Sequence, residues 1–207
     1  MSILDGSRFD TFRKARSFTW SNILFRALWL LTWKTLAAWT PPQFHPWRRI
    51  ILRLFGAKIG QGVLIWPSAR IWYPPNLVME DYSVLGWGTE CYCMAPVTIG
   101  TRAVVSQYAQ LIAGSHDIDD PNFQLIAKPI HVGDHAWIAT GAFVGPGVTV
   151  GEGAVLGARA LAFANLEAWT VYVASPAQAI KKRTRFGNRP TSPECELQKS
   201  PSPSADA

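Results

Sequence analysis

The sequence of 207 residues predicts a β-solenoid, a fold in which short strands stack in successive coils, and three observations support this prediction. Aliphatic residues recur every six positions over much of the chain. A small residue follows most of the aliphatic ones in the longest run, and the two breaks in the period indicate loops. A period of six fits neither an α-helix, with 3.6 residues per turn, nor a flat strand, with a period of two.

The longest unbroken run lies between residues 132 and 156. We expect each hexapeptide to form a short strand and a turn, and three hexapeptides to form one triangular coil with the aliphatic side chains inside. Small residues suit the corners, where the chain turns tightly and glycine permits a positive φ. The aliphatic residues are Val132, Ile138, Val144, Val150 and Leu156, and the residues that follow them are Gly133, Ala139, Gly145, Gly151 and Gly157.

Two shorter runs extend the predicted solenoid back to residue 59. The period breaks twice, because neither the step from Leu77 to Ile99 nor the step from Leu111 to Val132 is a multiple of six. We interpret the second break as one full coil with three extra residues, in a protruding loop at 114–130. This loop is rich in Asp, Asn and Pro, and loops on rigid scaffolds often contain catalytic residues. The two runs are Ile59, Ile65, Ile71 and Leu77, then Ile99, Val105 and Leu111.

Four segments are predicted, of which the solenoid at 59–186 is the largest. A basic lead occupies residues 1–16, and an apolar and basic helical extension occupies residues 17–58. The tail at 187–207 is rich in Pro and Ser and lacks the repeat, so we expect it to be disordered.

The formal net charge of +6 belongs to the two ends of the chain. Residues 1–58 contain ten Lys and Arg against two Asp and Glu, residues 59–180 four against nine, and residues 181–207 six against three. An acidic central body argues against a nucleic-acid-binding protein. Three Cys are too few for a disulfide scaffold, and Cys91, Cys93 and Cys195 are expected to be free thiols in a reducing cytoplasm.

The stretch from residue 20 to residue 39 is apolar and about long enough to cross a bilayer. Arg26 and Lys34 interrupt it and lie about 80° apart on a helix, where they form one charged edge. Pro41 and Pro42 end the helix. Packing against protein, a position at a membrane interface and a true span all remain open. We expect no signal peptide, because basic residues precede the apolar stretch and no small-residue cleavage site follows it.

Several motifs carry a resemblance to a known family. They are Gly114-Ser115-His116-Asp117, Lys128-Pro129-Ile130 and the segments 47–60, 132–138, 143–155 and 173–183. At these residues the sequence resembles the hexapeptide-repeat acyltransferases, especially the colanic-acid, maltose and galactoside O-acetyltransferases. The resemblance covers roughly residues 18–186. It implies a left-handed parallel β-helix, a homotrimer with active sites between subunits, and a cytoplasmic enzyme, with residues 17–58 available for contact with the inner face of the membrane.

The resemblance also implies a reaction. Acetyl-CoA would donate an acetyl group to a sugar hydroxyl, in the biosynthesis of an exopolysaccharide or a cell-surface glycan. The motif histidine falls on His116, which would act as general base, and histidine is the residue type that titrates near neutral pH. Asp117 belongs to the same motif. Trp87, Glu90 and Tyr92 occupy the neighbourhood of the acceptor pocket, and tryptophan is a suitable platform for a sugar ring.

The family's contacts to acetyl-CoA fall on further residues. The backbone N–H of Ala139 and the hydroxyl of Thr140 would donate to the tetrahedral intermediate. The backbone of Ala158 would contact the pantetheine arm. Gln178 stands where relatives have a basic residue, and the segment 159–165 lacks the usual lysine. The residues expected to meet the CoA phosphates are Lys181, Lys182 and Arg183.

Two other functions fit parts of the sequence. A carbonic anhydrase-like enzyme on the same fold would need three histidines around zinc, and His116, His131 and His135 supply that number. His131 and His135 are only four positions apart, however, and no carboxylate network accompanies them, so we expect no metal site. A non-enzymatic scaffold that docks at a membrane would show no turnover.

Overall fold

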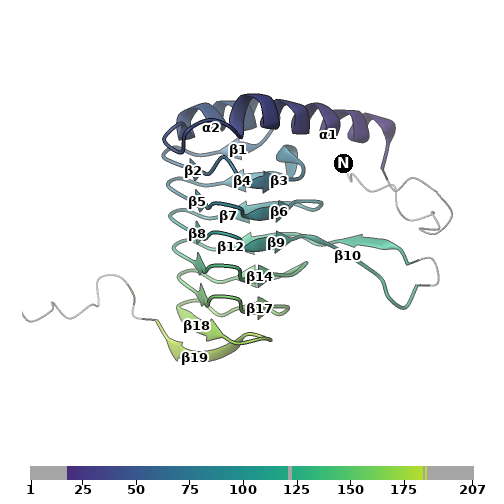
Figure 1. The fold of residues 1–207 in the computed structure, drawn as a ribbon. Helices are drawn as coiled ribbons and strands as arrows, with labels where there is room; N and C mark the ends of the chain where they lie inside the picture. Colours follow the sequence, from purple (N-terminus) through teal and green to yellow (C-terminus); the bar gives the residue numbers. More distant parts are fainter. Residues whose placement is uncertain (1–17, 121–122, 184, 186–207) are drawn as a thin grey trace, which may run out of the picture.

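The computed structural model describes residues 18–120, 123–183 and 185 (Figure 1). The predicted basic lead at 1–16, the tail at 187–207 and Cys195 lie outside these residues. Stacked coils form a prism, helices lie across one end of it, and a hairpin arm projects from its side (Figure 1). The arrangement matches the predicted solenoid with a helical extension and a protruding loop.

Within the described residues, parallel strands form three sheets, one on each side of the prism. The first sheet contains β1 (Lys58–Ile59), β4 (Leu77–Met79), β7 (Val97–Ile99), β12 (Ile130–Val132) and β15 (Thr149–Val150). The second contains β2 (Leu64–Ile65), β5 (Val84–Leu85), β8 (Val104–Val105), β13 (Trp137–Ile138), β16 (Val155–Leu156), β18 (Thr170–Val173) and the antiparallel β19 (Gln178–Lys182). The third contains β3 (Arg70–Ile71), β6 (Glu90–Tyr92), β9 (Gln110–Ile112), β14 (Phe143–Val144) and β17 (Leu161–Ala162).

The predicted aliphatic rows form the core of the prism. Val132 is paired in register with Val150, and Ile138 with Leu156, so each inward side chain stacks on its counterpart in the next coil. All four are fully buried. The expectation of free thiols is confirmed for Cys91 and Cys93, which are buried in the same core.

The small residues that follow the aliphatic ones have a different role from the one predicted. Positive φ occurs two positions later, for example at Gly147 and Gly153. At Gly133 and Gly151 the constraint is space, because an added Cβ would lie 2.7 Å and 2.5 Å from a backbone nitrogen of the next coil. Close approach of neighbouring coils, rather than a tight turn, therefore explains these glycines.

The first break in the period begins earlier than the aliphatic spacing indicates. Ile59 pairs with Met79, and Met79 pairs with Ile99, so each of the first two coils is two residues longer than three hexapeptides. Leu77 is also buried but pairs with Val97. The step from Leu77 to Ile99 therefore combines one enlarged coil with a shift of two positions along β4. In the first coil the extra residues lie at the corner between the third and first sheets, which contains the 3₁₀ turn η3 (Pro74–Asn76).

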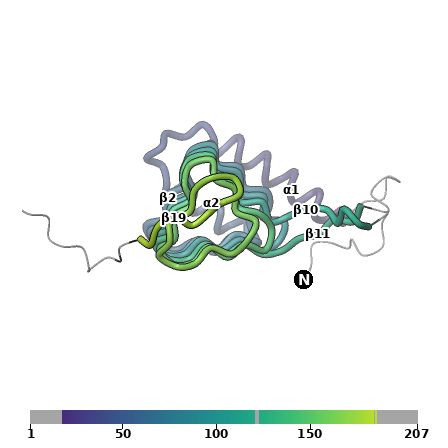
Figure 2. The backbone as a smooth tube through the Cα atoms, turned by 90° about the horizontal axis from the view of Figure 1, so that it is seen from below, coloured from purple at the N-terminus to yellow at the C-terminus, as the bar shows by residue number. Residues whose placement is uncertain are grey.

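The second break is larger than predicted. Leu111 lies in the third sheet and Val132 in the first, so one step of the period should separate them by six positions. The actual spacing leaves fifteen extra residues rather than three. They form an arm with the antiparallel strands β10 (Gly114–His116) and β11 (Leu125–Ala127), which extends away from the prism (Figures 1 and 2).

The N-terminal helices are α1 (Trp20–Thr32), its π-helical continuation η2 (Trp33–Ala37) and α2 (His45–Leu54). Thr19 begins α1 by accepting a hydrogen bond from the Asn22 N–H. On the buried face of α1, the Trp29 indole N–H donates to the Ile71 carbonyl at 2.7 Å, which ties the helix to the first coil. Among the described helices, none has the length and apolar character that crossing a membrane requires.

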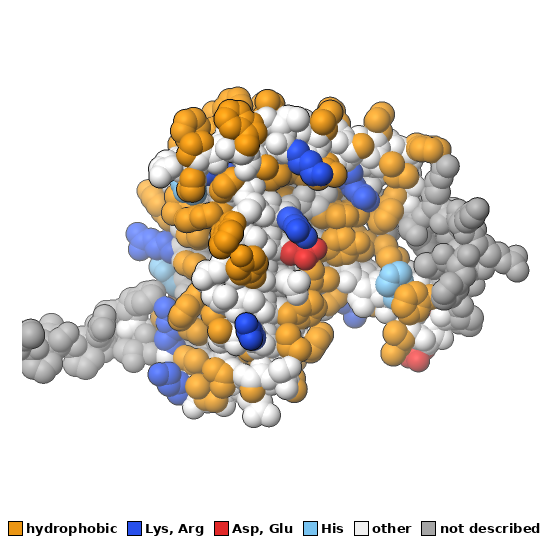
Figure 3. All heavy atoms as spheres, in the orientation of Figure 1, with side chains coloured by type: hydrophobic (Ala, Val, Ile, Leu, Met, Phe, Trp, Pro, Cys, Tyr) orange, Lys and Arg blue, Asp and Glu red, His pale blue; other side chains and the backbone are white. Residues whose placement is uncertain are grey.

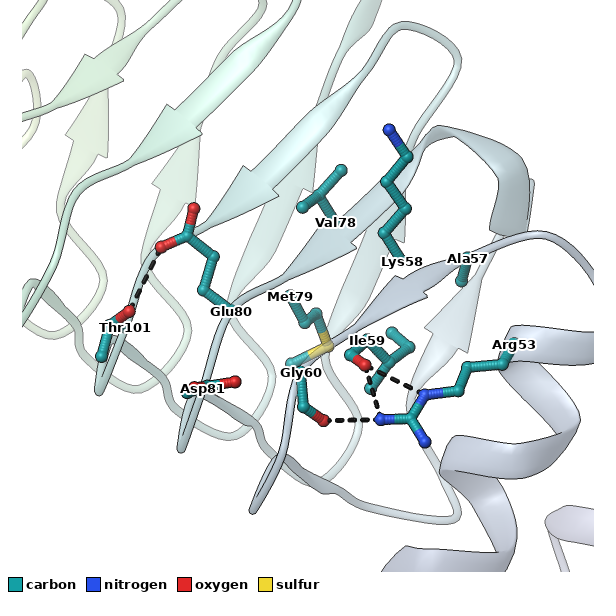
Figure 4. Close-up of a pocket in the computed structure, with 10 residues that line it drawn as sticks. All are labelled: Arg53, Ala57, Lys58, Ile59, Gly60, Val78, Met79, Glu80, Asp81 and Thr101. Atoms are coloured by element: carbon teal, nitrogen blue, oxygen red, sulfur yellow. Dashed lines mark hydrogen bonds between the residues drawn. The ribbon is translucent and has the colours of Figure 1, made fainter.

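Arginines of α2 fasten the helices to the prism. The guanidinium of the fully buried Arg48 donates to the Ile65 carbonyl at 2.7 Å, to the Thr40 hydroxyl at 2.6 Å and to the carbonyls of Pro41 and Pro42. Burial lowers the pKa of Arg48, but an arginine keeps its charge. Figure 4 shows Arg53 reaching the carbonyls of Ile59 and Gly60 beside a cleft that contains no predicted site residue.

Replacing Arg48 with methionine should destabilise the protein by about 3 kcal/mol, because the buried Ile65 carbonyl and Thr40 hydroxyl lose their donor. The neighbouring Arg49→Met variant is the control and should cost less than about 1 kcal/mol, since Arg49 makes one 3.2 Å bond to the Val63 carbonyl. Urea unfolding measures both. Equal losses would contradict the role assigned to Arg48.

Candidate active site

Three of the predicted site residues lie in one column along the prism. Trp87, Thr140 and Ala158 each lie two positions after an inward residue of β5, β13 or β16, and Gln107 takes the corresponding position after β8. These strands are paired in register, so the four residues occupy successive coils at the corner between the second and third sheets. Neighbouring coils are about 4.8 Å apart. The column is therefore a straight edge along which an extended ligand can lie.

Ala139 and Thr140, the two residues predicted to stabilise the tetrahedral intermediate, differ in the hydrogen-bond donors that they have available. The Ala139 N–H donates to the Leu156 carbonyl at 2.8 Å, as part of the ladder between coils, so this donor is already used. The prediction for Ala139 is wrong in this respect. Thr140 lies on the turn at the corner, half-buried, and only its carbonyl is bonded, accepting from the Arg159 N–H at 2.9 Å, among the residues described. Its N–H and hydroxyl remain for a ligand.

His116 lies on β10 of the arm, and its ring is fixed by Phe123 on the return segment. Nδ1 lies 2.8 Å from the Phe123 carbonyl, and the two rings stack with centroids 4.2 Å apart and planes inclined by 10°. Because a carbonyl oxygen only accepts, Nδ1 must carry the hydrogen. Nε2 of the neutral ring is then an acceptor. A histidine oriented in this way is arranged as a base.

Asp117 follows His116 where the arm turns. Its N–H donates to the Gln124 carbonyl at 2.8 Å, and its carboxylate accepts from the Asp119 N–H at 3.0 Å. The side chain thus stabilises the turn that follows the catalytic candidate.

The described chain does not bring His116 to the column. The arm leaves the prism at the corner between the third and first sheets, whereas Thr140 lies at the corner between the second and third. Figure 2, which looks along the prism, shows the arm extending outward from its edge. The two groups lie on different edges of one chain.

Glu90 and Tyr92 lie on β6 and line a groove of about 720 Å³ between α1 and the third sheet. Trp87 is not in this groove; it packs against Tyr108, with ring centroids 5.3 Å apart. Much of the groove is lined by aliphatic and small side chains, and its other side chains are aromatic or basic. They include Arg26, Trp33, Lys34, Arg70 and Trp72.

Sequence reasoning missed the basic side of this groove, although Arg26 and Lys34 were recognised as a charged edge of the helix. The Arg26 guanidinium lies 4.1 Å from the ring centre of Trp72, and Tyr92 meets Trp72 edge-on at 5.1 Å. Burial lowers the pKa of Arg26 and raises the pKa of Tyr92. In the part of the chain that the structure describes, Arg26 forms no ion pair. Three cations, including Arg70, face the single carboxylate of Glu90.

The basic residues predicted to meet CoA phosphates are partly engaged within the chain. Lys182 forms an exposed ion pair with Glu167 at 2.6 Å, and this pair lowers the pKa of Glu167. The Arg183 guanidinium donates to the carbonyls of His135 at 3.0 Å and Gly153 at 2.9 Å. Lys181 is exposed on β19.

A smaller cleft of about 310 Å³ adds residues that the sequence did not indicate. Arg102, His135 and Trp137 line it together with Arg183. Arg102 comes from a turn several coils earlier in the chain than Arg183, and only the stacking of coils brings the two together. The cleft is basic, which suits an anionic ligand.

The three histidines considered for zinc lie apart. His116 is on the arm, His131 is exposed on β12, and His135 lies in the turn after it. Among the residues described, no three His, Cys, Asp or Glu side chains form a group able to hold a metal ion.

Comparison with known proteins identifies the fold and the family. No family model matches the chain. A maltose O-acetyltransferase from Clostridium difficile 630 has the same fold, with a TM-score of 0.74 and 21% identity, covering 89% of this chain and 96% of its own. A hexapeptide-repeat acetyltransferase from Vibrio cholerae O1 biovar eltor, complexed with acetyl coenzyme A, has a TM-score of 0.73 and 19% identity, covering 89% and 97%. The solenoid is thus the left-handed β-helix of hexapeptide-repeat acetyltransferases.

A relative of higher sequence identity shows to which family within this fold the chain belongs. The protein of Escherichia coli (strain K12) named "Putative colanic acid biosynthesis acetyltransferase WcaF" is 41% identical over 172 residues, which are 83% of this chain and 94% of the relative. The chain belongs to this family of hexapeptide-repeat acetyltransferases and is an acyltransferase. This assignment sets aside the non-enzymatic scaffold and the carbonic anhydrase-like enzyme.

Proposed function

We propose that the protein transfers the acetyl group of acetyl-CoA to a hydroxyl of a sugar, in the cytoplasm, during the synthesis of an exopolysaccharide or a cell-surface glycan. The observation that carries this proposal is the fixed imidazole of His116, whose Nε2 is left as an acceptor on a protruding arm. The name of the Escherichia coli relative supports the pathway class, and the acetyl-CoA complex of the Vibrio cholerae protein supports the donor.

In the proposed reaction, Nε2 of His116 takes the proton of the acceptor hydroxyl while the oxygen attacks the thioester carbon. The Phe123 carbonyl, which accepts from Nδ1, stabilises the imidazolium that forms. The N–H and hydroxyl of Thr140 donate to the developing oxyanion. The carbon–sulfur bond then breaks, and His116 returns its proton to the CoA sulfur, so the enzyme regains its starting state.

The positions of the reacting groups support a homotrimer with sites between subunits. General-base catalysis requires the base within about 3 Å of the proton it removes. Since His116 and Thr140 lie on different edges of one chain, we propose that the arm of one subunit reaches the column of the next. The pantetheine arm would run along the column past Ala158. Lys181 and the basic cleft around Arg102 are the remaining groups for the phosphates.

The groove beneath α1 is the proposed acceptor site. Aromatic rings of Trp72 and Tyr92 offer apolar faces to a sugar, and the Glu90 carboxylate can accept from its hydroxyls. The excess of cations favours a saccharide that carries an anionic group. Asp117 and Trp87 would contact the acceptor near the column.

The His116→Ala variant should lose acetyl transfer by at least about 100-fold, because the hydroxyl loses its base. Folding and oligomeric state should be unchanged, since the hydrogen bond and the stacking contact of the ring both lie within the arm itself. The assay follows acetyl-CoA consumption over candidate saccharides and lipid-linked intermediates, with products identified by mass spectrometry. Equal rates for the variant and the wild type would contradict the assignment.

Two arginine variants should distinguish the proposed acceptor site from the proposed donor site through their effects on KM. Arg26→Met should raise KM for the acceptor about tenfold and leave KM for acetyl-CoA unchanged, because it removes a cation from the groove alone. Arg102→Met, the matched variant in the basic cleft, should do the reverse. Steady-state kinetics measures both KM values, with the acceptor that the acetyl-CoA consumption assay identifies. Equal changes in both constants for either variant would refute the assignment of that site.

A further inference from the structure

The outer face of the helices at the end of the prism is strongly apolar. We call α1, η2 and α2, residues 20–54, the cap. Many of its large apolar side chains are exposed along its length, and Figure 3 shows apolar side chains gathered over the top of the molecule. The most exposed, between 61% and 79%, are Trp20, Leu24, Leu31, Trp39 and Leu54.

These side chains do not belong to the core of the prism. The cap already packs on the first coil through its opposite face, where Trp29 is 2% and Leu52 0% exposed. The helices lie flat across the end of the prism (Figure 1). The exposed residues therefore form an end surface that points away from the coils. A surface that faces only water rarely presents so many large apolar side chains.

The charge of the cap favours an anionic partner over a second copy of the chain. Residues 20–54 contain no Asp or Glu and five Lys and Arg, of which only Arg48 is fully buried. Two caps placed face to face would bring like charges together without a carboxylate, which disfavours a second copy as the partner. Anionic lipid headgroups complement this charge. The exposed Trp20 begins α1 and the exposed Trp39 lies in the turn just after η2, and tryptophan prefers the membrane–water interface.

We propose that the cap docks the protein on an anionic lipid bilayer, with α1 and α2 lying in the plane of the interface and the prism standing end-on. The apolar side chains enter the boundary between headgroups and acyl chains, and the exposed Lys34 at the edge of the cap meets the phosphates. No helix needs to span the bilayer. The proposal stands without the acetyl-transfer mechanism, but with it the acceptor groove beneath α1 opens close to the membrane surface.

The test is a vesicle flotation assay on the full chain. Vesicles of phosphatidylcholine alone are compared with vesicles of phosphatidylcholine and phosphatidylglycerol in equal amounts. The wild type should bind the anionic vesicles more tightly, and added salt should weaken binding. Leu24→Asn and Leu31→Asn should each weaken binding about tenfold, because each removes a large apolar group from the interface.

Phe163→Asn is the matched control, since Phe163 is 65% exposed but lies on the body of the prism; it should bind as the wild type does. Circular dichroism and sedimentation verify that the variants fold and assemble alike. Absence of wild-type binding to anionic vesicles would overturn the proposal, as would equal loss in the control. Self-association that Leu24→Asn abolishes, without any binding to vesicles, would assign the surface to a second copy instead.

Discussion

The in-register hydrogen-bond ladder between coils is the constraint on which the rest of the structure depends. Ile138 is held between Val105 and Leu156 because the strands on either side fix its height and its direction. A single extra residue within a face would turn the following inward side chains outward and the outward ones inward. Additional residues can therefore leave the prism only at its corners, and the arm and the longer first coils do so.

This constraint explains what the sequence could and could not predict. The inward row from Val132 to Leu156 and the solenoid itself follow from the period, because the ladder repeats one environment every six positions. The lengths of the early coils did not follow, because Leu77 and Met79 are both apolar and buried, and spacing alone does not tell which one continues the row. The arm was underestimated for the same reason, since Leu111 and Val132 belong to different faces.

The candidate site was predicted in parts. A resemblance in the motif around His116 indicated a base, and Phe123, which fixes its ring, could be recognised only once the hairpin was known. The Ala139 N–H was assigned to a ligand, but its use in the ladder depends on the register with Leu156. The groove joins residues of α1 to β6, and no local pattern in the sequence connects them. Contacts between residues of different coils or helices can thus be recognised only from the three-dimensional structure.

The same rigidity separates the parts of the proposed enzyme along and around the prism. The column proposed for the donor occupies one corner, the arm with the proposed base projects from another, and the helices cover one end. A prism cannot bend to bring its own corners together, so the proposed reaction calls for a second chain, whereas the proposed membrane docking involves the cap of each chain. The central claim is therefore that each active site combines the arm of one subunit with the column of another.

Subunit complementation tests this claim most directly. His116→Ala removes the base from the arm, and Thr140→Trp obstructs the column, so each variant alone should be inactive. Co-expressed in equal amounts, they should recover about a quarter of the wild-type activity, because about a quarter of the sites combine an intact arm with an intact column from different chains. Mixed oligomers that form but remain inactive would contradict the account.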